Sequence, residues 1–241
     1  MDYQKLTDKL VSWVRDKVEA AGGKGAVLGL SGGLDSSVAA VLSHRTFPED
    51  TLALVIPCHS SKEDIEHANL LASRFSIPTQ TVALDQTYDT LLKVLPDDKD
   101  SQASRLAQAN LKARLRMLSL YYFANRLNYL VVGSSNRDEL TLGYFTKYGD
   151  GGVDIQPLGS LLKGQVRELA EFLGIPQAII DKPASAGLWE GQTDEEELGL
   201  SYYQIDRYLA SGKASALVKK RLETMIASSQ HKRQSPPVAE L

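Results

Sequence analysis

The feature that most constrains this chain is a glycine- and serine-rich turn between two apolar segments. An apolar run over residues 26–30 enters the turn Ser31-Gly32-Gly33, and the chain leaves it as an apolar helix. Because Gly32 and Gly33 have no Cβ, the backbone there can adopt positive φ angles and approach a ligand closely. The N–H groups of the turn and of the first helical turn then point into one concavity, at the positive end of the helix dipole. The sequence therefore predicts an anion site, most naturally for phosphate.

Asp35 follows this turn, where a carboxylate repels a phosphate unless a cation lies between them. Hard cations prefer oxygen donors and often bridge a carboxylate to phosphates, so we expect Asp35 to be a magnesium ligand. The alternative is an ordinary strand–turn–helix corner in which Asp35 only caps the helix. The turn lacks the lysine of G-x-x-x-x-G-K-[ST] and the spacing of G-x-G-x-x-G, so neither common phosphate fingerprint applies.

Length and composition limit the classes of protein that this chain can represent. With 241 residues, 43% of them hydrophobic and 24% charged, we expect a single domain over residues 1–241. The net charge of −3 argues against a nucleic-acid coat. Cys58 is the only cysteine, which excludes a disulfide framework or a zinc cluster and suits a reducing compartment. Because no apolar run approaches membrane-spanning length and the N-terminus is charged, we expect a cytoplasmic protein that binds no membrane.

Apolar strands alternate with amphipathic helices along the chain. We expect strands at about 26–30, 52–57, 81–84 and 129–133, and helices at about 2–20, 34–45, 62–75, 101–127 and 160–174. This alternation predicts an α/β fold with a doubly wound parallel sheet and flanking helices. Ligands of such sheets bind beyond the carboxyl ends of the strands, at a topological switch point. The turn at Gly32 and Ser134 both follow strands, so we expect them on one rim.

Three further segments are interpreted from their patterns. In the helix at about 101–127, one buried face is predicted from the spacing of Leu111, Leu115, Leu118 and Tyr122. The interval 87–105 is polar, and we expect it to be mobile before substrate binds. Residues 195–229 are interpreted as two helices.

Two segments after the fourth strand carry further polar groups. Residues 133–139 again place small polar residues between a strand and a helix, and Glu139 is expected on the same rim as Asp35. Two carboxylates near a polyphosphate make a magnesium site, whereas the alternative is a solvated glutamate at a helix start. Residues 143–154 have too many glycines for a helix and too many aromatics for a solvated linker. This segment, with Lys147, Asp150 and Asp154, is interpreted as an ordered loop near a ligand, and plain packing is the alternative.

These segments together resemble known proteins. The Ser-Gly-Gly-x-Asp-Ser loop resembles that of the ATP pyrophosphatases, which split ATP between the α and β phosphates. Over nearly the whole chain, the order of motifs resembles that of NAD synthetases; the segments that carry the resemblance are residues 31–36, 110–117, 133–139, 143–150, 157–163, 183–189 and 192–195. The resemblance implies an adenine nucleotide alpha hydrolase-like fold and a ligase that uses ATP, Mg²⁺, deamido-NAD⁺ and ammonia. It also implies a homodimer, for which the helix at 101–127 is the candidate interface.

The implied reaction proceeds in two steps. ATP adenylates the nicotinate carboxylate of deamido-NAD⁺ and releases pyrophosphate, and ammonia then attacks the acyl-adenylate to give NAD⁺ and AMP. The resemblance assigns ATP contacts to Gly29, Leu30, Ser31, Gly32, Gly33, Leu34, Asp35, Ser36, Ser134, Lys163 and Ser185. It assigns magnesium to Asp35 and Glu139, and deamido-NAD⁺ contacts to Arg114, Lys147, Asp154, His231 and Lys232. The catalytic residues are then Asp35, Lys163 and Asp150, with Asp150 near the ammonia or the nicotinate.

Two details of this assignment remain open. Lys163 near the start of its helix opposes the dipole preference, and a bound phosphate would remove that conflict. After the second strand, residues 56–59 stand where some relatives place an arginine, which leaves the base contacts undetermined.

Other functions are weighed against this one. Larger relatives carry an amidase domain that releases ammonia from glutamine; here the synthetase region begins within about 25 residues of Met1, so we expect free ammonia or a separate donor protein. Another ATP pyrophosphatase is the nearest alternative, such as the synthetase portion of GMP synthetase or a tRNA thiolase. A thiolase would need more cysteines, and a tRNA modifier a basic surface. A nucleotide-binding sensor related to universal stress proteins would leave Asp35, Glu139 and Lys163 without a role.

Overall fold

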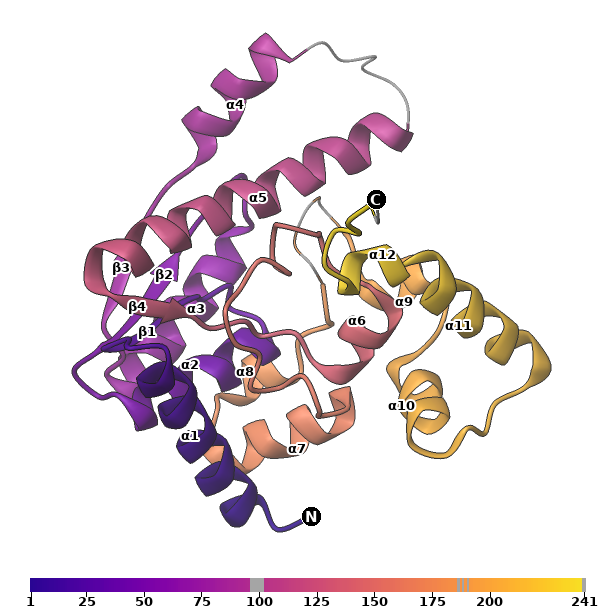
Figure 1. Ribbon diagram of the computed structural model, residues 1–241, viewed down its shortest axis with the longest axis horizontal. Helices are drawn as coiled ribbons and strands as arrows, with labels where there is room; N and C mark the ends of the chain where they lie inside the picture. Colours follow the sequence, from indigo (N-terminus) through magenta and orange to yellow (C-terminus); the bar gives the residue numbers. More distant parts are fainter. Residues whose placement is uncertain (96–101, 186, 188, 190, 240–241) are drawn as a thin grey trace.

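A parallel sheet forms the centre of the computed structural model, which describes residues 1–95, 102–185, 187, 189 and 191–239. Its strands are β1 (Gly25–Gly29), β2 (Thr51–Val55), β3 (Thr79–Thr81) and β4 (Tyr129–Val131) (Figure 1). Their order is β3-β2-β1-β4, and each neighbouring pair is parallel. The chain moves outward from β1 to β3 and then returns to the other side of β1, so the switch point lies between β1 and β4. The doubly wound fold is confirmed, and the turn after β1 lies at the switch point.

One face of the sheet packs against helices from both halves of the chain. They are α1 (Tyr3–Ala20), α2 (Leu34–Thr46), α3 (Lys62–Phe75), α7 (Lys163–Leu173) and α8 (Gln177–Ile180). Leu28 of β1 and Ala53 of β2 point into this layer, where they join Val38 of α2 and Leu169 of α7 in one apolar core. The helical periodicity of α1 and α3 follows from this packing, as predicted, whereas the apolar α2 is buried around most of its circumference.

The opposite face is covered by α4 (Asp85–Val94) and α5 (Gln102–Leu127) (Figure 1). Val27, Leu54 and Val131 point to this side, where Leu115 and Phe123 of α5 cover them. Every residue of β1 but the last is buried because both faces of the strand are covered.

The region of α4 departs from the prediction of a polar, mobile interval. Residues 85–94 form a helix, and its Tyr88, Leu91 and Leu92 pack against the α5 side of the sheet. An apolar residue every three or four positions gives this helix a buried side in spite of its polar neighbours. Residues 102–105 of the interval begin α5, and residues 96–101 lie outside the described residues.

Two further predictions are wrong in position. The third strand covers Thr79–Thr81 instead of 81–84, and the N–H groups of Val82 and Leu84 still donate to the carbonyl oxygens of Val55 and Pro57 before α4 begins. On α5, Leu115 is buried as predicted, but Leu118 and Tyr122 are each 59% exposed. The helix packs on the sheet with Leu115, Phe123 and Ala124 instead, so a second apolar stripe faces outward.

The C-terminal third adds a small separate layer. It contains α6 (Arg137–Leu142), α9 (Asp194–Leu198), α10 (Tyr202–Ser211), α11 (Ala216–Ser228) and α12 (Gln230–Arg233). Leu142, Leu198, Ile205 and Leu222 form its own apolar cluster. The two helices expected over 195–229 are therefore divided further, at the glycines that follow α9 and α10. Among the described helices, none combines the length and the apolar character needed to cross a bilayer.

Candidate functional site

A cavity of about 1080 Å³ opens beyond the carboxyl ends of β1, β2 and β4. Its walls are the turn after β1, the inner face of α5, the loop 143–154 and the segment that precedes α9. Ligand pockets commonly measure roughly 300–1,000 Å³, so this one is large enough for a nucleotide together with part of a second substrate. The cavity lies at the switch point, where the sequence predicts the ligand.

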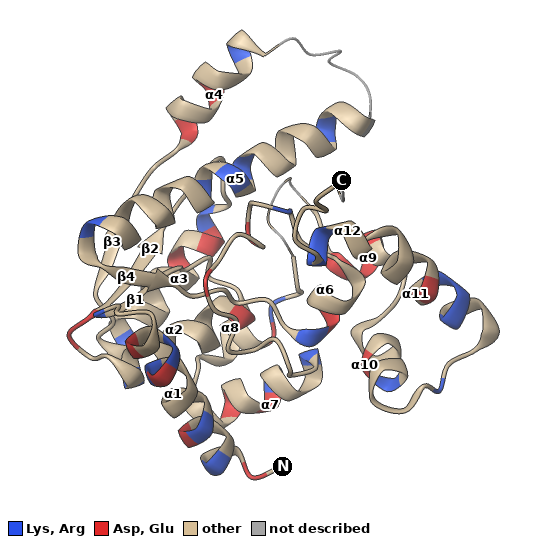
Figure 2. Cartoon of the chain, in the orientation of Figure 1, with Lys and Arg blue, Asp and Glu red and all other residues tan. Residues whose placement is uncertain are grey.

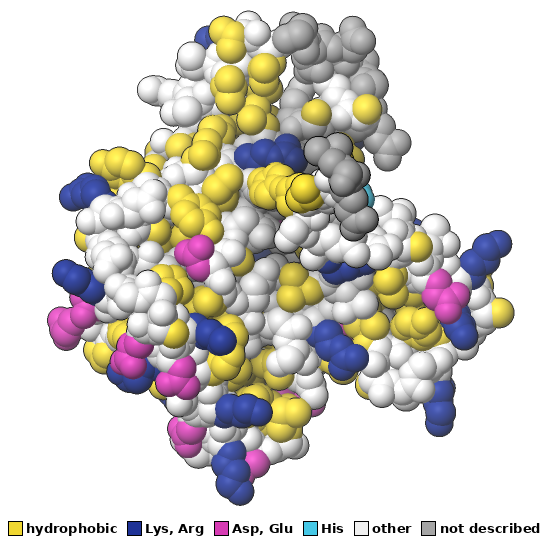
Figure 3. Space-filling model, in the orientation of Figure 1, with side chains coloured by type: hydrophobic (Ala, Val, Ile, Leu, Met, Phe, Trp, Pro, Cys, Tyr) yellow, Lys and Arg dark blue, Asp and Glu magenta, His cyan; other side chains and the backbone are white. Residues whose placement is uncertain are grey.

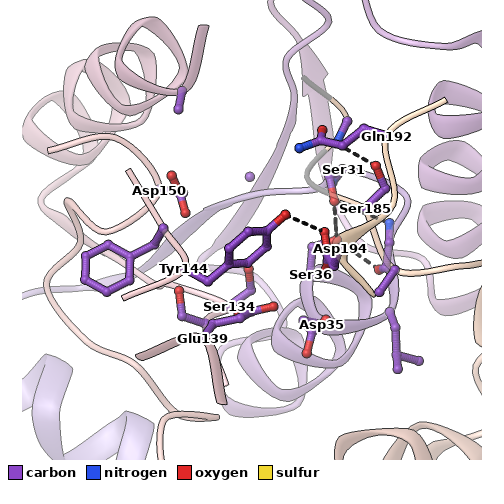
Figure 4. A pocket seen from close by; sticks show the side chains of 18 of the residues that line it. Ser31, Asp35, Ser36, Ser134, Glu139, Tyr144, Asp150, Ser185, Gln192 and Asp194 are labelled. Atoms are coloured by element: carbon purple, nitrogen blue, oxygen red, sulfur yellow. Dashed lines mark hydrogen bonds between the residues drawn. The ribbon is translucent and has the colours of Figure 1, made fainter. Parts of the chain in front are cut away.

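The turn after β1 is shaped to approach an anion. Gly32 has a φ of 79°, and a Cβ at this position would lie 2.1 Å from the carbonyl oxygen of Asp64, so no other residue fits without movement. Gly33 is the N-cap of α2 and offers no capping side chain, which leaves the first amides of α2 open to a ligand. The hydroxyls of Ser31 and Ser36 lie 2.9 Å apart and brace the turn (Figure 4).

Two carboxylates and one ammonium meet beside this turn. Lys163 Nζ donates to Asp35 and lies 3.9 Å from Glu139 Oε1. Asn136 fixes both acids: its Nδ2 donates to Asp35 Oδ1 at 3.0 Å, and its N–H donates to Glu139 Oε2 at 3.1 Å in a capping box of α6. Glu139 is therefore both a helix cap and part of the site, and the alternative of a solvated glutamate is wrong.

The electrostatics of this group favour a further cation. Burial raises the pKa of Glu139 well above its ordinary value, and the neighbouring charge of Asp35 raises it further. Burial by itself would lower the pKa of Lys163, but Asp35 and Glu139 outweigh it and the pKa is raised. One ammonium thus lies beside two acidic groups, and a further cation next to them would favour the ionised form of Glu139.

A magnesium ion that is partly held by phosphates fits this donor set. Mg²⁺ is commonly bound by one or two carboxylates, by substrate phosphates and by water. Within the described residues there is no cluster of three or more His, Cys, Asp or Glu side chains that could hold a metal. Asp35 and Glu139 lie next to the phosphate-binding turn. They therefore fit a magnesium site that is completed by substrate phosphates and water, and not a site made of protein ligands alone.

Sequence reasoning missed the residues that enclose Lys163. Asp194 is only 4% exposed and accepts hydrogen bonds from Tyr202 OH at 2.8 Å and from Tyr144 OH at 3.2 Å (Figure 4). Lys163 Nζ lies 5.0 Å from the ring centroid of Tyr202. The sequence predicts Tyr202 only as part of the helical segment 195–229, and Asp194 only as part of a segment that carries the family resemblance.

The start of α7 resolves the conflict between Lys163 and the helix dipole. The N–H of Lys163 donates to Asp138 Oδ2 at 3.0 Å, and the N–H of Gly164 donates to Asp206 Oδ2 at 2.9 Å. Oxygens of two acidic side chains thus accept the first N–H groups of this helix, at its positive end. No bound phosphate is needed to explain a lysine at this position.

Most of the predicted ATP-contacting residues line the cavity. They are Gly29, Leu30, Ser31, Gly33, Leu34, Asp35, Ser36, Ser134, Lys163 and Ser185. Gly32 does not line it, because this residue packs against α3 at Asp64. Four segments that are far apart in the sequence therefore meet where the strand ends predict.

The loop 143–154 is ordered, and it lines the cavity with Asp150. The N–H of Thr146 donates to Asp150 Oδ1 at 2.9 Å. The Asp150 side chain is exposed to the cavity, and the surrounding protein desolvates it enough to raise its pKa. Lys232 lines the cavity as well, and its Nζ donates to the carbonyl oxygens of Gly143 and Phe145, each at 2.8 Å. Lys232 therefore holds the loop in place.

The other residues predicted to contact a dinucleotide lie outside the cavity wall. Arg114 Nη2 donates to the Lys147 carbonyl at 3.3 Å, and Lys147 Nζ donates to the His231 carbonyl at 2.7 Å. Asp154 instead accepts the N–H of Val131 at 2.8 Å, at the end of β4. Figure 2 shows that α5 and α12 both carry Lys and Arg next to the central loops. Arg114 and Lys147 thus form a basic surface beside the cavity instead of a part of its lining.

Comparisons with known proteins place this geometry in a family. The model of the NAD synthase family matches residues 6–236. A relative from Syntrophomonas wolfei, an NH(3)-dependent NAD(+) synthetase, is 48% identical over 241 residues, which cover 99% of this chain and 97% of the relative. The solved structure of an NMN synthetase from Francisella tularensis has a TM-score of 0.94 and 38% identity, with 100% of both chains covered. An NH3-dependent NAD synthetase from Campylobacter jejuni has a TM-score of 0.81 and 30% identity, again over 100% of both chains.

Proposed function

This chain belongs to the NAD synthase family, and we propose that its cavity performs the ammonia-dependent synthesis of NAD⁺ from deamido-NAD⁺ and ATP. The enzyme is a ligase that forms an amide C–N bond. The observation that carries the proposal is the group of Asp35, Glu139 and Lys163 beside the open amides of α2. Residues 1–241 act as one domain, and the reaction takes place in the cytoplasm.

The first step uses the turn after β1. A carboxylate is a poor electrophile, so the nicotinate carboxylate attacks the α-phosphorus of ATP, pyrophosphate leaves, and the carboxyl oxygen becomes part of a good leaving group. The amides of the turn and the hydroxyls of Ser31, Ser36 and Ser134 hold the phosphates, and Lys163 neutralises charge on them. Fixed donors and cations are sufficient for this transfer, which needs no covalent nucleophile from the protein.

Asp35 and Glu139 would hold the magnesium ion next to these phosphates. When bound, Mg²⁺ supplies positive charge to phosphate oxygens as pyrophosphate departs. Asn136 keeps both carboxylates oriented through its two hydrogen bonds.

The second step takes place toward the loop 143–154. Ammonia attacks the carbonyl carbon of the acyl-adenylate, the bond to the AMP oxygen breaks, and the nitrogen loses one proton. Asp150 would accept this proton, because the raised pKa of its desolvated carboxylate favours the protonated form. The ammonia comes from solution or from a separate donor protein.

A pyrophosphate-release assay tests this function. The protein is supplied with ATP, Mg²⁺ and ammonium, with and without deamido-NAD⁺, and glutamine replaces ammonium in a parallel arm. We expect release that depends on deamido-NAD⁺ and on ammonium. No release would indicate a nucleotide sensor, release that ignores deamido-NAD⁺ would indicate another synthetase, and turnover with glutamine alone would contradict the proposed nitrogen source.

A second candidate substrate is nicotinate mononucleotide, because the solved NMN synthetase matches this chain with a TM-score of 0.94. The same adenylation and amidation would then act on a smaller acceptor that lies wholly inside the cavity. The basic surface of Arg114 and Lys147 outside the cavity favours the dinucleotide. The ratio of kcat/KM for the two acceptors in the same assay decides between them.

We predict that Arg114→Ala weakens the binding of deamido-NAD⁺. The loss of a hydrogen bond to a charged group corresponds to roughly 1.5–3 kcal/mol, so we expect the KM for deamido-NAD⁺ to rise about tenfold or more. The KM for ATP should stay unchanged, because Arg114 does not line the cavity. An unaltered KM for deamido-NAD⁺ would show that the assignment of Arg114 is wrong.

We also propose that the enzyme is a homodimer joined through α5. Leu118 and Tyr122 of this helix are each 59% exposed, and Figure 3 shows hydrophobic side chains gathered over α4 and α5. Contiguous apolar surface of this kind is typical of an interaction site. Sedimentation should give a dimer mass, and a monomer mass that does not change with concentration would contradict the proposal.

A further inference from the structure

The inner face of α5 carries one guanidinium into the cavity. Arg116 lines the cavity wall, and its Nε donates to the carbonyl oxygen of Ile56 at 3.1 Å. Its Nη2 donates to Ser60 Oγ at 3.2 Å. Both partners are neutral, and both belong to the segment that follows β2.

Arg116 lacks the carboxylate partner that Lys163 and Lys182 of the same cavity have, and Lys232, which donates to two carbonyl oxygens, lacks one as well. Lys163 is paired with Asp35, and Lys182 is paired with Asp64. Within the described residues, no Asp or Glu lies within ion-pair distance of Arg116, and its Nη1 group has no hydrogen-bond partner. Burial lowers the pKa of this guanidinium, so its charge is poorly solvated. A desolvated charge of this kind is unfavourable until an anion pairs with it.

The topology places Arg116 across the phosphate-binding turn from the magnesium site. The strand order puts β2 and β4 on opposite sides of β1. Arg116 is anchored at the end of β2, whereas Glu139 follows β4. The turn after β1 lies between these two groups, so a ligand bound there has Asp35, Glu139 and Lys163 on one side and Arg116 on the other.

The chemistry of the guanidinium limits which part of a ligand Arg116 would bind. Arg116 only donates hydrogen bonds, and its planar fork matches the two oxygens of a carboxylate or phosphate. A paired donor of this kind matches O6 and N7 of guanine, whereas adenine offers an acceptor and a donor at the same edge. An anion is therefore a better partner for Arg116 than the base of ATP.

We infer that Arg116 binds an oxyanion of the reacting centre, either the carboxylate of the acceptor or the α-phosphate that this carboxylate attacks. Adenylation joins these two groups in one acyl phosphate, so a single guanidinium can hold the anion before and after the first step. Arg116 is then a substrate-contacting residue in addition to those assigned by resemblance. This inference rests on the proposed function.

Binding measurements on Arg116→Gln and Arg116→Lys test the inference without turnover. Titration calorimetry with ATP alone, deamido-NAD⁺ alone and NAD⁺ alone separates the two sources of the oxyanion. If Arg116 binds the carboxylate, Arg116→Gln weakens deamido-NAD⁺ binding about tenfold or more and leaves NAD⁺ binding unchanged, because NAD⁺ has an amide at that position. If it binds the α-phosphate, the ATP affinity falls by a similar factor. Arg116→Lys should restore part of the loss in either case.

Two controls separate ligand binding from a structural role. Arg207→Gln removes an exposed arginine of α10 and should leave all three affinities unchanged. Ser60→Ala removes one anchor of Arg116 but keeps its charge. The inference would be overturned if Arg116→Gln bound all three ligands with unchanged affinity while both Arg116→Gln and Ser60→Ala unfolded at a lower temperature than the wild type. Arg116 would then only stabilise the segment after β2. Failure of the proposed function would differ from failure of this inference, because the wild-type protein would then release no pyrophosphate with either acceptor.

Discussion

Asp35→Asn is expected to abolish turnover and to leave the fold intact. The asparagine keeps an oxygen for the hydrogen bond from Asn136 Nδ2, which is 3.0 Å long, and it has nearly the same volume. It removes the negative charge that pairs with Lys163 and that would hold Mg²⁺ at the phosphates. Charge stabilisation by a metal contributes several kcal/mol to a transition state. A loss of about 4 kcal/mol corresponds to roughly a thousandfold decrease in kcat.

The measurement is the rate of pyrophosphate release at saturating ATP and deamido-NAD⁺ over a range of Mg²⁺ concentrations. We expect no recovery of the rate at high Mg²⁺, together with an unfolding midpoint close to that of the wild type. Asp16→Asn is a matched control, because Asp16 is an exposed carboxylate of α1 far from the cavity lining. A variant Asp35→Asn with near wild-type kcat would rule out Asp35 as the principal acidic group of the site.

The parts of the fold that the sequence predicts are those fixed by local periodicity. The spacing of apolar residues in α1 and α3 and the continuous apolar runs of α2 and β2 reflect burial within one element and its nearest neighbours. The face that α5 turns to the sheet depends on the position of the whole helix over β1 and β4. The sequence alone therefore predicted burial for Leu118 and Tyr122, which the structure exposes.

The candidate site likewise has parts that the sequence predicts and parts that it does not. Asp35 and Glu139 are predicted to converge because each follows a strand that ends at the same rim, whereas Lys163 is assigned to the site only through the family resemblance. Asn136 holds Asp35 across 101 residues of sequence, and no local pattern indicates that contact. Tyr202 likewise encloses Lys163 only because the small layer of α9 and α10 folds against the sheet. Contacts of this kind depend on how separate layers pack and on side-chain orientation.

A buried pair of acids beneath the site gives the protein a defined dependence on pH. Asp138 is fully buried and lies within hydrogen-bonding reach of Asp206, which accepts the N–H of Gly164. The Oδ1 atoms of both acids are buried and receive no hydrogen bond from a described residue. Burial, followed by the contact with Asp206, raises the pKa of Asp138 from 3.8 to about 8. At neutral pH the Asp138 carboxyl is therefore protonated and can donate to Asp206.

Folded protein then binds a proton that the unfolded chain releases near pH 4. Because the pKa is higher in the folded state, the stabilisation from this proton is fully present below about pH 4 and is lost as the pH rises to about 8. Over that window we expect the free energy of unfolding to fall by up to about 1.4 kcal/mol per pH unit from this group. Above pH 8 the Asp138 carboxyl is ionised in both states and contributes no further slope.

We predict that Asp138→Asn flattens the pH dependence of stability between about pH 5 and pH 8. The amide oxygen can accept the N–H of Lys163 as Asp138 Oδ2 does at 3.0 Å, and the amide nitrogen can donate permanently to Asp206. Urea unfolding at a series of pH values should give a smaller slope in the variant, with the largest gain in stability at pH 8. Asp16→Asn should keep the wild-type slope, since it removes only an exposed carboxylate. Equal slopes in Asp138→Asn and the wild type would show that Asp138 holds no proton in this window.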